Sequence, residues 1–207
     1  PQVTVDYPTL GDVLDLALST GRPVYLIKDM PGIEVKVDVE AEGKLWRVRG
    51  PAVSLEPVFT NGAALDDAMI LVGHDRWPEE PLPGDALQVS LIWETVRPVD
   101  TVYHSYVHLQ DAKGQTVTQS DRQPGGVYYP TSVWQPGERL RDDHLLQIPA
   151  DVPQGSYRIV VGMYALPAGG ALRALGEPLV IGQFSLGTSA LVIPSGSSQS
   201  LPALLLQ

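Results

Sequence analysis

Short β-prone runs separated by glycine- and proline-rich turns dominate the sequence from about residue 51 onward. Leu87, Val89, Leu91 and Trp93 recur at every second position, which is the period of a strand with one buried face. The chain holds 20 glycines and 19 prolines in 207 residues, about one residue in five against about 12% in an average protein. Many of them form turn signals between the runs, at Pro83-Gly84-Asp85, Gln135-Pro136-Gly137-Glu138, Val152-Pro153-Gln154-Gly155 and Ala168-Gly169-Gly170. This pattern predicts a mainly β protein, an antiparallel β-sandwich of the jelly-roll or immunoglobulin-like kind.

Residues 1–50 have a different pattern, which predicts a small α/β lead-in segment. Residues 3–5 are β-prone, Thr9 is a suitable helix N-cap, and Gly21 stands where a left-handed C-cap belongs. The run at residues 24–27 is continuously apolar, which favours a buried, parallel strand and hence a strand–helix–strand unit. The apolar stripe expected on the helix consists of Val13, Leu14, Leu16, Ala17 and Leu18.

A hairpin is expected to complete this segment. Residues 33–39 alternate strictly, a turn follows, and residues 45–49 alternate back. We therefore divide the chain into a lead-in at 1–50, a β-sandwich domain at 51–187 and an uncharged Ser/Leu-rich tail at 188–207. Within the sandwich, further strands are expected at residues 101–109, 115–118, 145–148, 157–164 and 178–186. Residues 65–71 fit either a short helix or the first strand.

Charge and composition exclude several classes of protein. The formal net charge is −10, whereas a nucleic-acid partner requires a concentrated basic face. The chain has no cysteine, so disulfide scaffolds, thiolate metal sites and cysteine nucleophiles are excluded. No stretch approaches the ~20 apolar residues of a membrane-spanning helix. We expect no nucleic-acid partner and no cofactor.

The loop at residues 123–134 holds the strongest candidate for a binding site. Tyr128, Tyr129 and Trp134 are amphipathic rings that could stack on the faces of sugars, and Gly125 and Gly126 allow a tight bend. The alternative is a structural arch in which these rings cap the end of the sandwich. Aromatic rings serve cores so often that the structural interpretation is the favoured one.

His104, Tyr106 and His108 share one face of an expected strand. Alternate residues on a strand lie about 7 Å apart and the two histidines about 13 Å apart, so the strand alone cannot bring both to one metal ion. A metal site would need a partner such as His74 or His144 from elsewhere in the chain. We therefore favour a half-buried face of aromatic and imidazole side chains and predict no metal site.

The acidic residues give no catalytic assignment. Asp66-Asp67 and Asp142-Asp143 could contribute to a Ca²⁺ site, but no Asp-x-Asp-x-Asp-Gly loop is present and neighbouring strand residues point to opposite faces. Glu94 and Glu138 could form a glycosidase pair, although nothing in the sequence sets their separation. No nucleophile or phosphate-binding motif occurs. We predict no catalytic residue.

The sandwich carries motifs that resemble a recurring extracytoplasmic β domain. They are Leu82-Pro83-Gly84-Asp85-Ala86-Leu87, Leu91-Ile92-Trp93, Arg97-Pro98-Val99-Asp100-Thr101, Val107-His108-Leu109, Gln119-Ser120-Asp121, Tyr129-Pro130-Thr131-Ser132, Trp134-Gln135-Pro136-Gly137-Glu138 and Pro153-Gln154-Gly155-Ser156-Tyr157. The domain they resemble lies at the C-terminal end of polytopic bacterial membrane glycosyltransferases of the dolichyl-phosphate-mannose protein mannosyltransferase-like kind. Gly21-Arg22-Pro23-Val24-Tyr25-Leu26 is similar to a strand that leads into it. The resemblance covers roughly residues 10–187.

This resemblance implies a non-catalytic accessory domain. In that family the catalytic carboxylates lie in loops of the membrane portion, so none is carried over to this chain. The expected partner is the upstream membrane portion of the same polypeptide, with the domain held outside the cytoplasm and assisting glycan or acceptor binding. A chain that begins at Pro1 rather than methionine agrees with an excised domain. The alternatives are a free-standing carbohydrate-binding or Ca²⁺-stabilised adhesion module, and a hydrolase that uses Glu94 or Glu138.

Overall fold

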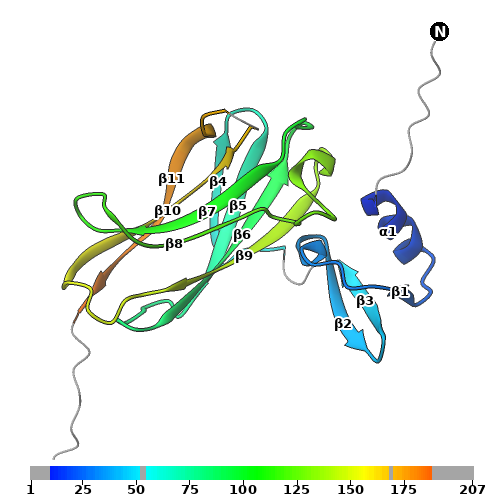
Figure 1. Cartoon of the computed structure of the whole chain (residues 1–207), viewed down its shortest axis with the longest axis horizontal. Coiled ribbons are helices and arrows are strands. Elements are labelled where there is room, and N and C mark those ends of the chain that lie inside the picture. Colours follow the sequence, from blue (N-terminus) through cyan, green and yellow to red (C-terminus); the bar gives the residue numbers. More distant parts are fainter. Residues whose placement is uncertain (1–9, 52–54, 168–169, 188–207) are drawn as a thin grey trace, which may run out of the picture.

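Two antiparallel four-stranded sheets, with a smaller sheet and a helix at one end, make up the fold (Figure 1). The structure is a computed structural model, which describes residues 10–51, 55–167 and 170–187. Buried side chains from both large sheets form one hydrophobic cluster, so the sheets pack face to face. The predicted fold class, a mainly β protein built on a β-sandwich, is confirmed.

The first large sheet, called the β6 sheet here, has the strand order β4-β5-β6-β9. Its strands are β4 (Phe59–Leu65), β5 (Met69–Trp77), β6 (Ala86–Thr95) and β9 (Arg139–Gln147). The second, called the β7 sheet, has the order β11-β10-β7-β8. Its strands are β7 (Tyr103–Gln110), β8 (Thr116–Arg122), β10 (Gly155–Ala165) and β11 (Arg173–Leu186). Strands β6 and β9 pair with each other in one sheet, although the β7–β8 hairpin comes between them in the sequence. That hairpin belongs to the other sheet. The connections therefore cross between the two layers, as in Greek-key sandwiches.

Alternation along β7 separates the core from the open face of its sheet. Tyr103, Ser105, Val107 and Leu109 are buried, whereas the residues between them are half-buried. A strand places successive side chains on opposite faces, so the even-numbered residues of β7 point away from the sandwich core. The predicted face with His104, Tyr106 and His108 therefore exists, and it is the outer face of the β7 sheet.

The lead-in contains one helix and a three-stranded sheet of order β1-β3-β2. Its elements are α1 (Leu10–Ser19), β1 (Val24–Leu26), a 3₁₀ turn (Ile33–Val35), β2 (Val37–Glu42) and β3 (Leu45–Pro51). The predicted β2–β3 hairpin and the left-handed Gly21 C-cap, with φ +67°, are confirmed. Buried lead-in residues such as Leu14 and Ile33 belong to the same hydrophobic cluster as the sandwich core.

Three expectations for the lead-in are corrected by the structure. The run at residues 24–27 is not a buried parallel strand: β1 pairs antiparallel with β3 at the edge of a small sheet, and Ile27 is 86% exposed. Residues 33–35 form a 3₁₀ turn instead of a strand, because the left-handed Gly32 redirects the chain just before them. On α1 the buried positions are Gly11 and Leu14, while Leu16 of the predicted stripe is exposed.

The structure also resolves the open interpretation of residues 65–71, whereas several predicted segments lie outside the residues it describes. Residues 65–71 are neither one helix nor one strand: they comprise the last residue of β4, a turn at residues 66–68 with Asp66 at φ +47°, and the start of β5. The strand predicted at 3–5, the cap at Thr9 and the tail at 188–207 lie outside the described residues. In the part of the chain that the structure describes, no helix is long and apolar enough to span a membrane.

Candidate functional site

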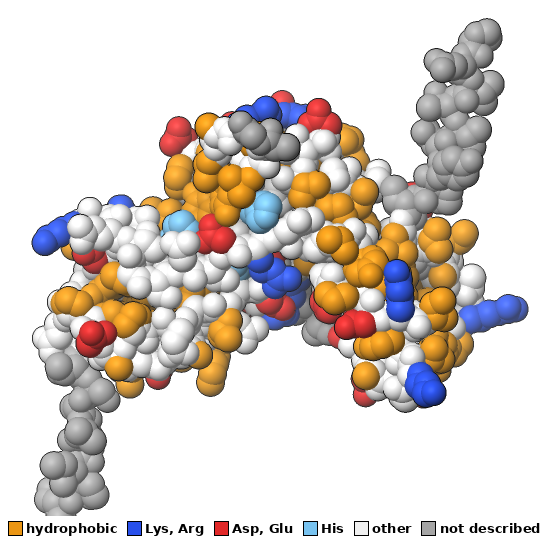
Figure 2. All heavy atoms as spheres, in the orientation of Figure 1, with side chains coloured by type: hydrophobic (Ala, Val, Ile, Leu, Met, Phe, Trp, Pro, Cys, Tyr) orange, Lys and Arg blue, Asp and Glu red, His pale blue; other side chains and the backbone are white. Residues whose placement is uncertain are grey.

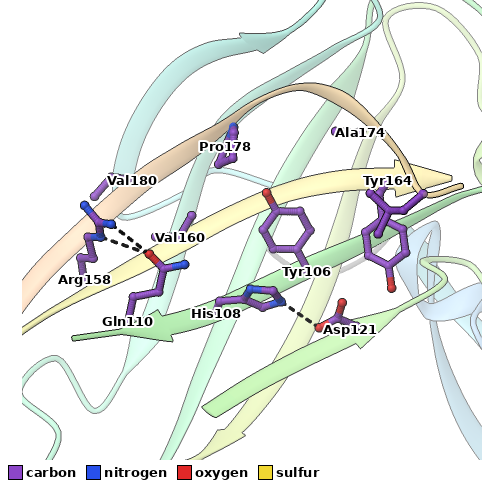
Figure 3. A pocket seen from close by; sticks show the side chains of 11 residues that line it. Tyr106, His108, Gln110, Asp121, Arg158, Val160, Tyr164, Ala174, Pro178 and Val180 are labelled. Carbon is purple, nitrogen blue, oxygen red and sulfur yellow. Dashed lines mark hydrogen bonds and ion pairs between the residues drawn. The ribbon is translucent and has the colours of Figure 1, made fainter. Parts of the chain in front are cut away.

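A hollow of about 540 Å³ lies on the open face of the β7 sheet (Figure 3). Strands β7, β8, β10 and β11 all contribute to it, together with the segment just before β11. The residues that line it are Tyr106, His108, Gln110, Asp121, Arg158, Val160, Tyr164, Leu172, Ala174, Pro178 and Val180. In the orientation of Figure 1, histidines and apolar side chains gather on the surface of the sandwich beside an acidic group (Figure 2).

A glycine and a bulge create this hollow. Gly162 of β10 pairs with Tyr106 of β7, and a methyl group added to Gly162 would lie 2.5 Å from Tyr106 Oη and 2.8 Å from Cζ. The Tyr106 ring therefore lies over the backbone at Gly162 and forms the floor. On the other side of β10, residues 176–178 of β11 stand opposite this single glycine. The extra residues bend the edge strand, as a bulge does, and Pro178 is tolerated there because an edge strand does not need its N–H.

Four rings form a continuous row on this face. His104 stacks on Tyr164 with ring centroids 5.4 Å apart and planes 12° apart. Tyr164 lies 6.2 Å from Tyr106, which in turn lies 4.6 Å from His108. These separations are those of favourable aromatic pairs. The row holds the Tyr106 ring in place between Tyr164 and His108.

Polar groups stand on the β8 side of the floor and at one end of the hollow. His108 Nε2 lies 3.0 Å from Asp121 Oδ1, and both side chains are about one-quarter exposed. At the end of β7, Arg158 donates from Nε and Nη2 to Gln110 Oε1 at 3.2 and 3.1 Å. Figure 3 shows the His108–Asp121 pair next to the Tyr106 ring and the Arg158–Gln110 pair further along the hollow, beyond His108 and Val160. The hollow thus combines apolar contact area with a few fixed hydrogen-bonding groups, which is the composition of a ligand site.

Both tyrosines of the hollow are neutral and able to donate hydrogen bonds at neutral pH. Burial, followed by the charges of Asp121 and Glu177, raises the pKa of Tyr106. Burial and then contact with Asp121 raise the pKa of Tyr164. A phenol O–H donates and accepts, so each ring offers a polar tip as well as an apolar face.

The aromatic loop predicted from the sequence is mostly part of the core. Tyr129 is 0% and Trp134 1% exposed, which argues against the predicted glycan-stacking role for both rings. Tyr129 donates to Glu138 Oε1 at 2.8 Å, and Trp134 Nε1 donates to the Tyr129 carbonyl at 2.9 Å. Tyr128 remains half-buried, with Lys28 Nζ 4.8 Å above its ring. The structural arch is therefore what the loop forms around Tyr129 and Trp134.

The packing of the lead-in explains why this loop is buried. A methyl group on Gly11 of α1 would lie 2.3 Å from Tyr129 Oη, so the helix presses directly on that ring. Lys36 bridges the same region by binding Glu138 and Asp15. Burial raises the pKa of Tyr129 far above its usual range, with a further contribution from Glu138. The sequence of the loop alone carries no sign of this cover.

The candidate carboxylates are engaged in structural contacts. Glu138 binds Tyr129 and Lys36, and Glu94 accepts from Arg139 Nε at 2.8 Å. Asp67 accepts from Arg97 at 2.6 and 2.8 Å. In the chain as described, no three histidine or acidic side chains are grouped as a metal site requires. No carboxylate named here as a candidate faces the hollow.

A buried polar cluster, which the sequence interpretation missed, joins the two sheets where β8 meets β9. His144 Nε2 lies 3.0 Å from Asp142 Oδ2 and 3.1 Å from Ser105 Oγ, and its Nδ1 lies 3.1 Å from both the carbonyl and the hydroxyl oxygen of Ser120. A carboxylate only accepts, so Nε2 is the nitrogen placed to donate to Asp142, whereas Nδ1 lies beside both an acceptor carbonyl and a hydroxyl that can donate or accept. Serine and aspartate meet the same nitrogen of a fully buried imidazole, so this cluster lacks the geometry of a hydrolase triad. Alternation on β9, with Leu140 and Leu146 on the same face, was the signal that could have revealed it.

Comparisons with known proteins give no family for this chain and only distant structural similarity. No protein-family model and no curated protein matches the chain. The C-terminal domain of wzt aligns with 60% of this chain and 76% of its own at 10% identity and a TM-score of 0.46. A beta-glucuronidase from glycoside hydrolase family 2 aligns over 56% of this chain and 11% of its own, at 12% identity and a TM-score of 0.38. Northeast Structural Genomics Consortium target SoR45 aligns over 70% of this chain and 99% of its own, at 16% identity and a TM-score of 0.27.

Proposed function

We propose that the chain is a non-catalytic accessory domain that binds carbohydrate on the open face of the β7 sheet. The observation that carries the proposal is the Tyr106 ring, which lies over Gly162 and is flanked by other rings and by the His108–Asp121 pair. A pyranose has apolar C–H faces and hydroxyl edges. An aromatic floor next to fixed acceptors and donors complements both.

The membrane context of this domain is also a proposal. It is supported by the sequence motifs that resemble the C-terminal domains of membrane glycosyltransferases, and it places this binding face outside the cytoplasm next to the membrane portion of the same polypeptide. There it would hold a glycan or an acceptor near the catalytic part. The same face would serve a free-standing carbohydrate-binding module. Sequence upstream of Pro1 distinguishes the two, since only the first requires several hydrophobic segments of ~20 residues.

Tyr106→Ala tests the proposed site directly. We expect the affinity for an oligosaccharide selected on a glycan array to fall by at least about tenfold, because losing the contact of one aromatic ring costs on the order of 1.4 kcal/mol or more. Isothermal titration calorimetry measures the change. Tyr128→Ala removes a half-buried ring outside the hollow and should leave the affinity unchanged. The proposal fails if the array shows no binding or if the two variants behave alike.

Gly162→Ala tests the same floor without removing a ligand contact. The added methyl group would meet the Tyr106 ring and force it to tilt away from the sheet. We expect an affinity loss of about tenfold or more, since an added methylene group in a fitted pocket changes binding by about 10- to 200-fold. Gly155→Ala, in the same strand but with no atom within 4 Å of the new methyl, is the matched control. Equal affinities for these two variants would show that the ring position is irrelevant.

A further inference from the structure

The wall of the hollow on the β11 side is aliphatic. Leu172, Ala174, Pro178 and Val180 contribute it, and Val160 of β10 extends it towards the floor. Leu172 is 59% and Val180 56% exposed, so apolar surface is presented to solvent here. The side chains of this wall offer no hydrogen-bond donor or acceptor. Exposed apolar side chains gathered in a hollow mark a binding surface rather than a requirement of the fold.

The opposite wall is polar, and the Tyr106 ring lies between the two. In the register of the sheet, Asp121 of β8 pairs with Tyr106, Tyr106 with Gly162, and residues 176–178 of β11 stand beyond Gly162. Of residues 176–178 only Pro178 lines the hollow, so a sugar ring stacked on Tyr106 would have one edge at the His108–Asp121 pair and the other at Pro178 and the aliphatic wall. The two edges of the ligand must differ in polarity.

We propose that the ligand is an oligosaccharide whose sugars carry a methyl group on the edge that faces β11. This inference rests on the carbohydrate-binding role proposed above and adds the chemical class of the sugar. Two common sources supply such a methyl group: the C6 position of a 6-deoxyhexose and the acetyl group of an N-acetylated sugar. A hydroxymethyl or hydroxyl group placed against this wall would lose its hydrogen bonds to water without gaining a side-chain partner. A methyl group has no such cost and gains apolar contact.

Pairs of sugars that differ at this group provide the test. Trisaccharides of each sugar are immobilised on a sensor surface and binding of the protein is measured. Those of L-rhamnose and L-mannose differ only in the 6-hydroxyl groups. Those of N-acetylglucosamine and glucose differ at the acetamido group. We expect the methyl-bearing member of one pair to bind about tenfold or more tightly, a discrimination typical of an apolar pocket. The pair that discriminates identifies the source of the methyl group. In saturation-transfer NMR of that ligand, its methyl protons should receive the strongest signal.

Val180→Thr keeps the shape of the side chain and places a hydroxyl group in the wall. We expect the preference for the methyl-bearing sugar to fall several-fold in this variant. Val58→Thr makes the same change at a residue 72% exposed and outside the hollow, and should preserve the preference. If both members of each pair bind equally while Tyr106→Ala weakens them all, the carbohydrate site stands and this inference is overturned. If no trisaccharide or array glycan binds, both the proposed carbohydrate site and the inference about a methyl-bearing sugar are overturned.

Discussion

Asp142→Ala is expected to destabilise the fold by about 3–5 kcal/mol, as measured by urea or thermal unfolding. The Asp142 carboxylate is fully buried, with the His144 ring 3.0 Å away and Arg122 Nε 3.6 Å away. Removing it leaves the fully buried imidazole, and the Arg122 guanidinium beside it, without their carboxylate partner. The polar groups left behind lose their partner in a region where water cannot replace it, which makes the substitution costly.

Two variants separate this effect from a general intolerance of β9. Asp143→Ala removes the neighbouring carboxylate, which binds Arg141 at 2.9 Å but is 48% exposed, and should cost only about 0–1 kcal/mol. The double variant Asp142→Leu with His144→Leu replaces the buried pair by apolar side chains. It should recover much of the stability lost in Asp142→Ala, because well-packed apolar groups can substitute for a buried ion pair. Equal losses for Asp142→Ala and Asp143→Ala would contradict the assignment.

Asp142 should also make the free energy of unfolding depend on pH. Burial alone would raise the pKa of Asp142, but the charge and hydrogen bond of His144, with Arg122 adding to them, hold it below its ordinary value. A folded-state pKa below the unfolded value means that the contribution is fully present above about pH 4 and is lost as the pH falls through the folded pKa. The difference in unfolding free energy between wild type and Asp142→Ala should therefore shrink below about pH 4. A constant difference from pH 7 to pH 2 would contradict this sign.

The sequence reveals those parts of the molecule that depend on local pattern. Alternation placed the even-numbered residues of β7 on one face, and the turn signals separated most of the strands. What alternation cannot supply is register between distant strands. Tyr106 meets Gly162 because β7 and β10 pair across more than fifty residues, and the aliphatic wall exists because β11 bulges at residues 176–178.

The two interpretations that the sequence leaves open for Tyr129 and Trp134 have the same physical origin. An aromatic ring near a Gly-Gly bend fits an exposed platform and a capped core equally well, and only the packing of another segment decides between them. Here α1 and Lys36, more than ninety residues earlier, cover the loop. The hollow on the open face of the β7 sheet could be found only once the positions of Gly162 and β11 were known, because the residues that shape it, a glycine and a bulge, have no side-chain chemistry typical of a binding site.

The junction between the lead-in and the sandwich gives the second large effect. We expect Gly32→Ala to destabilise the protein by about 2–5 kcal/mol, combining about 1–2 kcal/mol for a left-handed residue with about 1–3 kcal/mol for overpacking. Gly32 has φ +99°, and a methyl group there would lie 2.4 Å from the Gly125 carbonyl carbon and 2.5 Å from Gly126 N. These atoms are backbone, which cannot swing aside as a flexible side chain can.

Comparison with Gly84→Ala separates the steric part of the Gly32→Ala cost from the part due to the left-handed backbone. Gly84 has φ +93°, almost the same strain, but a methyl group there would make only an ordinary contact, 3.7 Å from Ala150 Cβ. It should therefore cost about 1–2 kcal/mol. Because the Gly32 clash lies between the lead-in and the aromatic loop, Gly32→Ala should also increase proteolysis of residues 10–51 and quench or shift the fluorescence of the buried Trp134, while Gly84→Ala should do neither. If the two variants lose equal stability, left-handed strain alone explains Gly32, and the close approach of Gly32 to Gly125 and Gly126 does not hold the lead-in against the sandwich.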